Sequence, residues 1–538
     1  MINTGKRIYE SESLAVRIAH GRSFEKVRES NPMNYKALIS LFLSNTIFVY
    51  LLAPAIIFIV VFSGCTTELP AVSAELKAGV ATTVISNQTP RVMVNGRISE
   101  GVHSDIKARA LVLNDGEHRL VIITSDLNCH DVITPFLRER VVDELGLDPS
   151  QLILLVTHNH NAPIQINPGN FDYGRRVADN IYDLIKEAIA NEQGPVSLHF
   201  GSGYGYFVAS VGNAPADYEV QVLKVKRGRI PVAVLFNHGM HPTQSTRNRI
   251  DTGHPGFAMD KIEAALPGVQ AMYAISSGGN QFYHNILELH KIIQESEYNR
   301  GIEHTDSILE IKSREIGRKL ADVVLDVVSG DMINVTGPLT SRLENISLPL
   351  ADPMPENEVR ELASRLPEDL GFVPYPHEHR GTNWIRMLLR YYDEGLPFPT
   401  GTADMICTFD TYLIHREDTE LLEKYDYSIH DRFPCIYEEV IVATIGSMPF
   451  VAMQGEVVAP IGARIKDAFR TEGPIMVFAY MGKHNLYIPT RELVRLDVYQ
   501  PRTIQTQYAS PVGWDPSVED VMVNGVIDMV TTSLEEME

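Results

Sequence analysis

The run Leu152-Ile-Leu-Leu-Val156, followed at once by Thr157-His158-Asn159-His160, is the stretch that decides the fold. A short run that is apolar at every position is typical of a strand buried on both faces, as in a parallel sheet. Helical patterns at 135–144 and 173–191 lie on either side of it. The chain shows no internal sequence repeat, but strands alternate with helices along most of its length. This alternation predicts an α/β fold with a mixed β-sheet core and flanking helices.

Polar residues follow several predicted strands at the point where each strand ends. One strand leads into Thr157-His158-Asn159-His160, a second into His241, a third into Glu456 and a fourth into Tyr480. In open α/β sheets, ligands bind beyond the carboxyl ends of the strands. We therefore expect these side chains to meet at one edge of the sheet and to form the functional site there.

Imidazole and carboxylate groups are the usual ligands of a hydrolytic zinc ion. The sequence thus predicts a metal site with His158 and His241 among the ligands. On an extended segment His158 and His160 point to the same face, so one ring can bind metal while the other transfers protons. Two other interpretations stay open. Each histidine can be a satisfied core or surface residue, and Glu456 can cap the helix predicted at 461–469.

The composition argues against a nucleic-acid partner. The net charge of the 538 residues is −21, whereas a nucleic-acid surface needs clustered Lys and Arg to neutralise phosphates. The cysteines show no CxxC or Cys/His spacing of a structural zinc site. A disulfide between Cys407 and Cys435 and buried free thiols, including Cys129, are the two alternatives.

Residues 1–64 are predicted to be a signal or anchor segment. Residues 37–62 carry no charged side chain and are long enough to cross a bilayer, and the segment before them has a net charge of +3. Ser63-Gly64-Cys65 is similar to a bacterial lipoprotein cleavage box, in which Cys65 would be lipidated. The alternative is an uncleaved anchor helix. Both predict an exported, membrane-anchored domain on the periplasmic or cell-surface side.

Residues 65–538 are predicted to form one hydrolase domain, in which the segment from about 340 to 435 is less regular. This segment carries many prolines and one predicted helix near 356–364. Long irregular segments inside compact domains are often functional. An inserted subdomain or a lid over the site is therefore expected here.

Five short motifs resemble, in order, those of the neutral (alkaline, non-lysosomal) ceramidases: Gly101-Val-His103 with Lys107-Ala-Arg-Ala-Leu111, Thr157-His158-Asn159-His160, Gly239-Met-His241-Pro-Thr243, Gln454-Gly-Glu456 and Tyr487-Ile-Pro-Thr490. The resemblance runs from about residue 75 to the end. It implies a catalytic domain with one zinc ion held by His158, His241, Glu456 and Tyr487. Tyrosine is a rare zinc ligand, so the choice of Tyr487 depends on the resemblance alone.

The resemblance also implies roles for two further residues and a reaction. His160 would transfer protons beside the metal, and Tyr499 would contact the reacting amide. The reaction would be hydrolysis of an N-acyl amide, which in the family is the fatty amide of ceramide. The predicted function is a zinc-dependent amidohydrolase with a lipid-like substrate. A metal-retaining surface binding protein and another metallohydrolase, such as an esterase, are the alternatives.

Two segments depart from the family pattern. The family has an Arg in an Asn-Arg-Ser-Pro segment, where this chain has Gly212-Asn213-Ala214-Pro215. The family also has a Gly-Asp-x-Ser-Pro-Asn loop, where this chain has Gly279-Asn280-Gln281-Phe282-Tyr283-His284 and lacks the Ser. The predicted metal ligands are thus present, while the residues expected to contact substrate differ.

Overall fold

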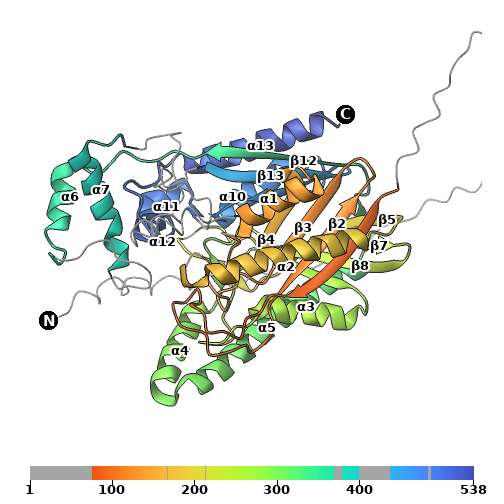
Figure 1. Cartoon of the computed structure of the whole chain (residues 1–538), viewed down its shortest axis with the longest axis horizontal. Helices are drawn as coiled ribbons and strands as arrows, with labels where there is room; N and C mark the ends of the chain where they lie inside the picture. Colours follow the sequence, from red (N-terminus) through yellow and green to blue (C-terminus); the bar gives the residue numbers. More distant parts are fainter. Residues whose placement is uncertain are drawn as a thin grey trace, which may run out of the picture. The chain divides into compact units, whose positions relative to one another are not determined.

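The core of the computed structural model consists of three β-sheets, each with the same arrangement of strands, and helices flank the sheets (Figure 1). The structure describes residues 75–131, 133–165, 168–212, 214–368, 379–398, 437–482 and 486–537. Each of the three sheets is a run of antiparallel strands that ends in one parallel pair. The mixed sheets and flanking helices confirm the predicted α/β fold.

The first sheet explains why the run Leu152–Val156 is apolar at every position. In spatial order its strands are β1 (Lys77–Val84), β2 (Lys107–Asn114), β3 (Arg119–Ser125) and β4 (Leu152–Val156). Alternate side chains of β4 enter two different cores: Leu152 and Leu154 pack into one, and Ile153 and Leu155 into the other. Both faces of β4 are therefore buried, and truncation such as Leu155→Ala is expected to cost about 2–5 kcal/mol of stability.

The second and third sheets repeat this arrangement. The second has the order β11 (Ile333–Asn334), β5 (Val196–Tyr204), β7 (Glu219–Arg227), β8 (Ile230–His238) and β9 (Gln270–Ile275), with β8 and β9 parallel. The third has the order β12 (Leu339–Ser347), β13 (Tyr437–Ile445), β14 (Met448–Met453) and β16 (Met476–Phe478), with β14 and β16 parallel.

Each sheet carries its own pair of helices. The helices are α1 (Ile133–Leu145) and α2 (Phe171–Ala190) for the first sheet, α3 (Gly253–Ala265) and α5 (Ile302–Ser329) for the second, and α10 (Ala459–Phe469) and α13 (Val518–Glu535) for the third. Read along the chain, each unit contains three strands of its sheet, a helix, the parallel strand and a second helix. The chain therefore repeats a topology three times without repeating a sequence.

The sheets share one apolar core and are joined near the ends of their parallel strands. Residues from strands of all three sheets form a single buried cluster with the loops beside them. The Gly482 amide donates to the Leu154 carbonyl oxygen, and the Ala479 amide donates to the Ile275 carbonyl oxygen. These bonds hold the carboxyl ends of β4, β9 and β16 together, at the edge where the sequence predicts the site.

Short elements complete the described fold. They are β6 (Val208–Ser210), which pairs with β10 (Gln281–Tyr283), β15 (Glu456–Val457), which pairs with β17 (Tyr487–Ile488), and the helices α4 (Ile286–Arg300), α6 (Glu356–Ala363), α7 (Asn383–Glu394), α11 (Arg491–Leu496) and α12 (Tyr499–Thr506). The sequence did not predict α4, α7, α11 or α12.

The segment expected to be irregular is partly regular. Its first residues form β12, an edge strand of the third sheet, and α6 and α7 follow and pack on each other. Residues 399–436, with Cys407 and Cys435, lie outside the described residues, so the possible disulfide and the lid stay predictions. Cys129 is a buried free thiol.

The predicted membrane anchor also falls outside the described part of the chain, since residues 1–74 are not included in it. Within residues 75–537, apart from the gaps given above, no helix combines the length and the apolar character needed to cross a bilayer.

Candidate metal centre

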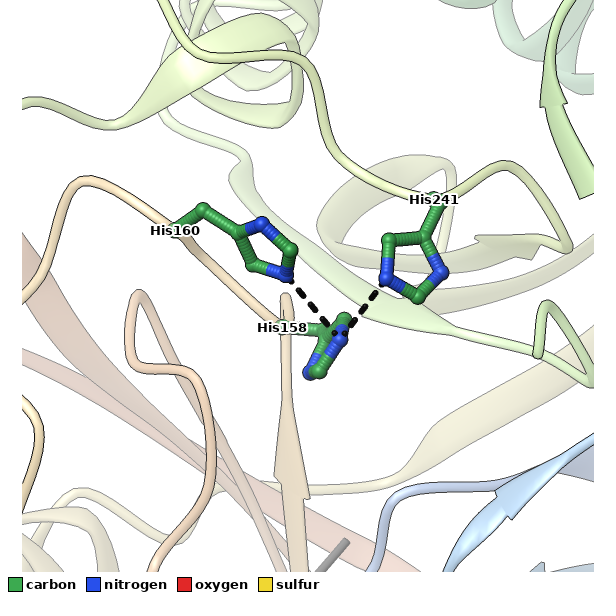
Figure 2. A group of neighbouring side chains, drawn as sticks. All are labelled: His158, His160 and His241. Atoms are coloured by element: carbon green, nitrogen blue, oxygen red, sulfur yellow. Dashed lines mark hydrogen bonds between the residues drawn. The ribbon is translucent and has the colours of Figure 1, made fainter. Parts of the chain in front are cut away.

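Three imidazole rings meet where β4 and β8 end. His158 Nε2 lies 3.1 Å from His241 Nε2 and 3.2 Å from His160 Nε2, and Figure 2 shows the three rings turned toward one another. His158 comes two residues after the end of β4, and His241 comes three residues after β8. In the described residues this is the one group of histidine, cysteine and carboxylate side chains gathered closely enough to be picked out as a candidate metal site.

Two residues of the centre have a strained backbone. His158 has φ 57° and Tyr480 has φ 59°, in the left-handed region that residues other than glycine rarely adopt. Their rings pack on each other, with centroids 4.4 Å apart. Such strain concentrates at functional sites, where the surrounding structure holds it in place. At His158 the left-handed backbone conformation turns the chain away from the direction of β4, so that the imidazole faces His241.

Backbone carbonyl groups fix the ring nitrogens that face away from the centre. His158 Nδ1 lies 3.0 Å from the Asn128 carbonyl oxygen, and His241 Nδ1 lies 3.2 Å from the Gly278 carbonyl oxygen. A carbonyl oxygen only accepts hydrogen bonds, so it favours the tautomer in which Nδ1 carries the proton and Nε2 presents a lone pair. His158 Nδ1 also lies 3.1 Å from Asn128 Nδ2, which is a donor, so for this ring the two Asn128 groups favour opposite tautomers. With the proton on Nδ1 in both rings, two lone pairs lie 3.1 Å apart and repel each other, and a cation bound to both removes that repulsion. The residues therefore fit a metal ion.

Burial keeps the imidazoles neutral, as metal ligands must be. It lowers the pKa of His158, His160 and His241 to about 3 in each case, because a charged ring would lose its hydration. His158 and His241 are buried, whereas His160 is partly accessible. Of the three rings, His160 is thus the one that a molecule entering from solvent reaches first.

Glu456 adds a carboxylate to the imidazoles. Gly455, with φ 84°, makes the turn after β14, and the parallel pairing of β15 with β17 sets Glu456 opposite Tyr487. Glu456 Oε2 lies 3.5 Å from His158 Nε2 and 3.8 Å from His241 Nε2. This oxygen is buried and has no hydrogen-bond partner among the described residues. A buried acceptor without a donor is costly, so the oxygen is well placed as a metal ligand.

Burial also raises the pKa of the Glu456 carboxyl to about 7. The neighbouring His241 and the hydroxyl groups of Tyr487 and Tyr480 act in the opposite direction, but they are weaker than the loss of hydration. The same burial raises the pKa of the Tyr487 and Tyr480 phenols well above their usual value, and the Glu456 charge adds to the shift. Without a cation, the carboxyl is therefore half-protonated near neutral pH.

The two predicted tyrosines lie side by side at the centre. The Tyr487 ring is nearly parallel to that of His241, with centroids 6.5 Å apart, and its hydroxyl acts on Glu456. Tyr499, the first residue of α12, packs its ring edge-on against Tyr487 at 5.7 Å and is 56% exposed. Its hydroxyl accepts a hydrogen bond from Gln507 Nε2. Tyr487 thus lies at the buried carboxylate and Tyr499 at the solvent side.

The structure brings the expected site residues together but does not separate their roles. His160 Nε2 is as close to His158 as His241 is, so geometry allows it to bind a metal as well as to transfer protons. Sequence reasoning missed the supporting groups. The Asn128 and Gly278 carbonyls that orient the rings belong to the backbone and carry no side-chain signal. Among the residues that support the centre, only Tyr480 had a sequence signal, namely its position at the end of an apolar run.

The strand pair β6 and β10, which we call the facing wall, lies directly beside His241. The His241 amide donates to the Gln281 carbonyl oxygen, and the Phe282 ring packs against the His241 ring with centroids 4.9 Å apart. Phe282 stands where the family loop has its Ser, so the departure from the family pattern touches the centre. Asn213, the other departing position, lies outside the described residues.

The fold and the centre together define a three-sheet α/β protein with a candidate metal site at the strand ends. No protein-family model matches the chain, and no curated protein matches it by sequence. Among solved structures it is similar to the neutral ceramidase from Pseudomonas aeruginosa, with a TM-score of 0.59 and 18% identity over 86% of this chain and 75% of that chain. It is also similar to a ceramidase complexed with C2, with a TM-score of 0.59 and 16% identity over 86% and 76%. The chain has the fold of the neutral ceramidases.

Proposed function

We propose that this chain is a metal-dependent hydrolase of the neutral ceramidase family that cleaves an N-acyl amide bond. The observation that carries the proposal is the meeting of neutral imidazoles and the Glu456 carboxylate at the strand ends of a ceramidase fold. An amide is a poor electrophile and water a poor nucleophile at neutral pH. A site for a Lewis acid is therefore the feature that this reaction requires most.

Zn²⁺, one per chain, is the proposed ion. Imidazole nitrogens with a carboxylate oxygen are the ligand set of hydrolytic zinc sites, and the proposal assigns His158, His241, Glu456 and Tyr487 to the ion. When bound, such an ion activates a water molecule and polarises the amide carbonyl. The Asn128 and Gly278 carbonyls keep the ligand rings in orientation, as outer groups do at such sites.

Two residues of the chain act on the substrate in this proposal. His160, neutral and partly accessible, takes a proton from the attacking water and delivers it to the departing amine. Tyr499, exposed beside Tyr487, donates a hydrogen bond to the carbonyl oxygen as negative charge develops there. Their positions on the solvent side of the ligands support this division.

The proposed substrate is lipid-like, because the structures that share the fold are ceramidases. The proposal includes export and attachment to a membrane, either by lipidation of Cys65 or by an anchor helix within 37–62. It is supported by the uncharged run, by the basic segment before it and by Ser63-Gly64-Cys65. Such a tether would hold the enzyme where amphipathic amides reside.

The test is turnover by the purified full chain, in detergent, on a panel of N-acyl amides with varied acyl chains and amines. We expect amide cleavage that a chelator abolishes and Zn²⁺ restores. Bound zinc without turnover across the panel would favour the surface binding protein instead. Cleavage of matched esters alone would favour an esterase.

A further inference from the structure

The imidazoles of the candidate centre come from two loops. The segment after β4, residues 157–161, carries His158 and His160, and the loop between β8 and α3, residues 239–252, carries His241. We call them the first and the second histidine loop. Because the rings extend from these loops toward each other, the contacts between the loops decide how far apart the rings lie (Figure 2).

Asn159, between the two histidines of the first loop, joins that loop to the second one. Its Nδ2 donates to the Asp251 carbonyl oxygen at 2.6 Å and to the carbonyl oxygen of Asp126, just after β3, at 3.1 Å. Its Oδ1 accepts from the Asn161 amide, which fixes the orientation of the side-chain amide. The side chain is buried, so water does not take the place of these bonds.

Asn161 makes a second connection between the same two loops. Its Nδ2 donates to the carbonyl oxygens of Thr246 at 2.9 Å and of Arg249 at 3.1 Å. Its own carbonyl oxygen accepts from the Asp251 amide at 3.2 Å, and its side chain is fully buried. Two side chains of the first loop thus hold the second loop, and we call Asn159 and Asn161 the asparagine clamp.

The second histidine loop is closed on itself, so a restraint on Asp251 also reaches His241. Asp251 Oδ1 accepts from the Ser245 hydroxyl and from the Gly253 amide. Ser245 lies only four residues after His241. The asparagine clamp therefore restrains the position of His241 through a short, hydrogen-bonded piece of backbone.

The separation of the rings is the quantity that such a restraint controls. Metal binding needs a lone pair on His158 Nε2 and on His241 Nε2, and these atoms lie 3.1 Å apart. Two nitrogens that bind one zinc ion at roughly 2.0–2.1 Å each lie about 3.3 Å apart in a tetrahedral site. Without an ion the lone pairs repel and favour a wider separation. Loops that are already held together avoid the cost of bringing the rings together when the ion binds.

We propose that Asn159 and Asn161 are positioning residues of the candidate metal centre, which hold the two histidine loops at the separation that a metal ion requires. The inference rests on the proposed metal-dependent function. It assigns part of the metal affinity to two side chains that bind backbone groups and not the ion. Removal of such outer groups typically lowers metal affinity by about 10–100-fold.

The first measurement is the zinc affinity of the full chain in detergent, by competition with a chelating dye. In Asn159→Ala and in Asn161→Ala we expect the Kd for zinc to rise by about 10–100-fold. The two variants break different hydrogen bonds of the clamp, so the test does not depend on how well one of them folds.

Asn170→Ala is the matched control. Asn170 is also buried, and its Nδ2 also donates to two backbone carbonyl oxygens, those of Val92 and Ile164, neither of which belongs to the second histidine loop. This variant should lose a comparable amount of thermal stability and keep the zinc affinity of the unchanged chain. A loss of affinity that only follows the loss of stability would appear in the control as well.

The second measurement is hydrogen exchange of the backbone amides in the metal-free full chain, which needs neither zinc nor turnover. Asn159→Ala should raise exchange in both histidine loops together, whereas Asn170→Ala should leave the second loop protected. Zinc affinity in both clamp variants equal to that of the control, or faster exchange confined to the first loop, would overturn the proposal. An unchanged chain that binds no zinc would contradict the proposed function instead, so the two failures are distinguishable.

Discussion

The candidate metal centre and the facing wall beside it follow the ceramidase pattern to different degrees. Every motif residue expected at the centre is present, and His158, His241 and Glu456 converge within 3.8 Å of one another. On the wall, Phe282 stands in place of a Ser and packs against His241. Metal ligation accepts few side-chain types, whereas a substrate-facing surface can change with the substrate. Under the proposed function, the difference predicts the same amide chemistry on a different substrate.

Removing a ligand histidine would test the metal centre most severely. In His158→Ala and in His241→Ala we expect zinc content to fall to a small fraction and amide hydrolysis to fall by about 10⁴-fold, since activation of water and of the carbonyl is lost together. Metal analysis and turnover are measured on the same samples. His199→Ala, a partly buried histidine on β5 outside the centre, is the control and should retain both. Full zinc occupancy in either ligand variant would contradict the assigned centre.

His160→Ala separates proton transfer from metal binding. If His160 acts only as acid and base, turnover should fall by roughly 10²–10³-fold while the zinc content stays unchanged. The structure makes this a sharp test, because His160 Nε2 is 3.2 Å from His158 Nε2 and geometry allows ligation. Zinc loss equal to that of His158→Ala would assign His160 to the ligands instead.

The affinity of the metal-free protein for zinc should depend on pH through Glu456. Its pKa is about 7, so the carboxyl is mostly ionised at pH 7.5 and mostly protonated at pH 5.5. Ligation needs the ionised form, and zinc should therefore bind roughly twentyfold more weakly at pH 5.5. The imidazoles, with pKa values of about 3, remain neutral across this window and do not contribute to the pH dependence. The raised pKa of Tyr487 keeps its phenol protonated, and this prediction takes it to bind through the neutral hydroxyl, without release of a proton.

Competition titrations with a chelating dye at the two pH values measure this difference. The matched variant is Glu456→Gln, which has no proton to release at this position. It should bind zinc more weakly at both pH values and with little difference between them. A slope as steep in Glu456→Gln as in the unchanged chain would place the titrating group elsewhere.

The sequence predicted the parts of the molecule whose cause is local. The apolar run of β4, the helices beside it and the polar residues after each strand all follow from side-chain pattern, and they place His158, His241 and Glu456 correctly at one edge. Leu339–Ser347 was expected to be irregular, because β12 is an edge strand with a half-exposed surface and little apolar alternation. The threefold topology arises from packing between sheets, which no local pattern records.

Phe282→Ser should have the smallest effect of these changes and bears most directly on the comparison. Phe282 is half-buried, and its phenyl ring has no atom that can bind a metal, so we expect zinc content and folding to remain unchanged. Its ring fills space beside His241, and its removal should shift the ratio of kcat/KM between short and long N-acyl amides by about tenfold. His284→Asn, on the same loop and also toward the family residue, is the control. If Phe282→Ser leaves that ratio unchanged but lowers zinc content, the wall supports the metal rather than selecting the substrate, and the two regions act as one.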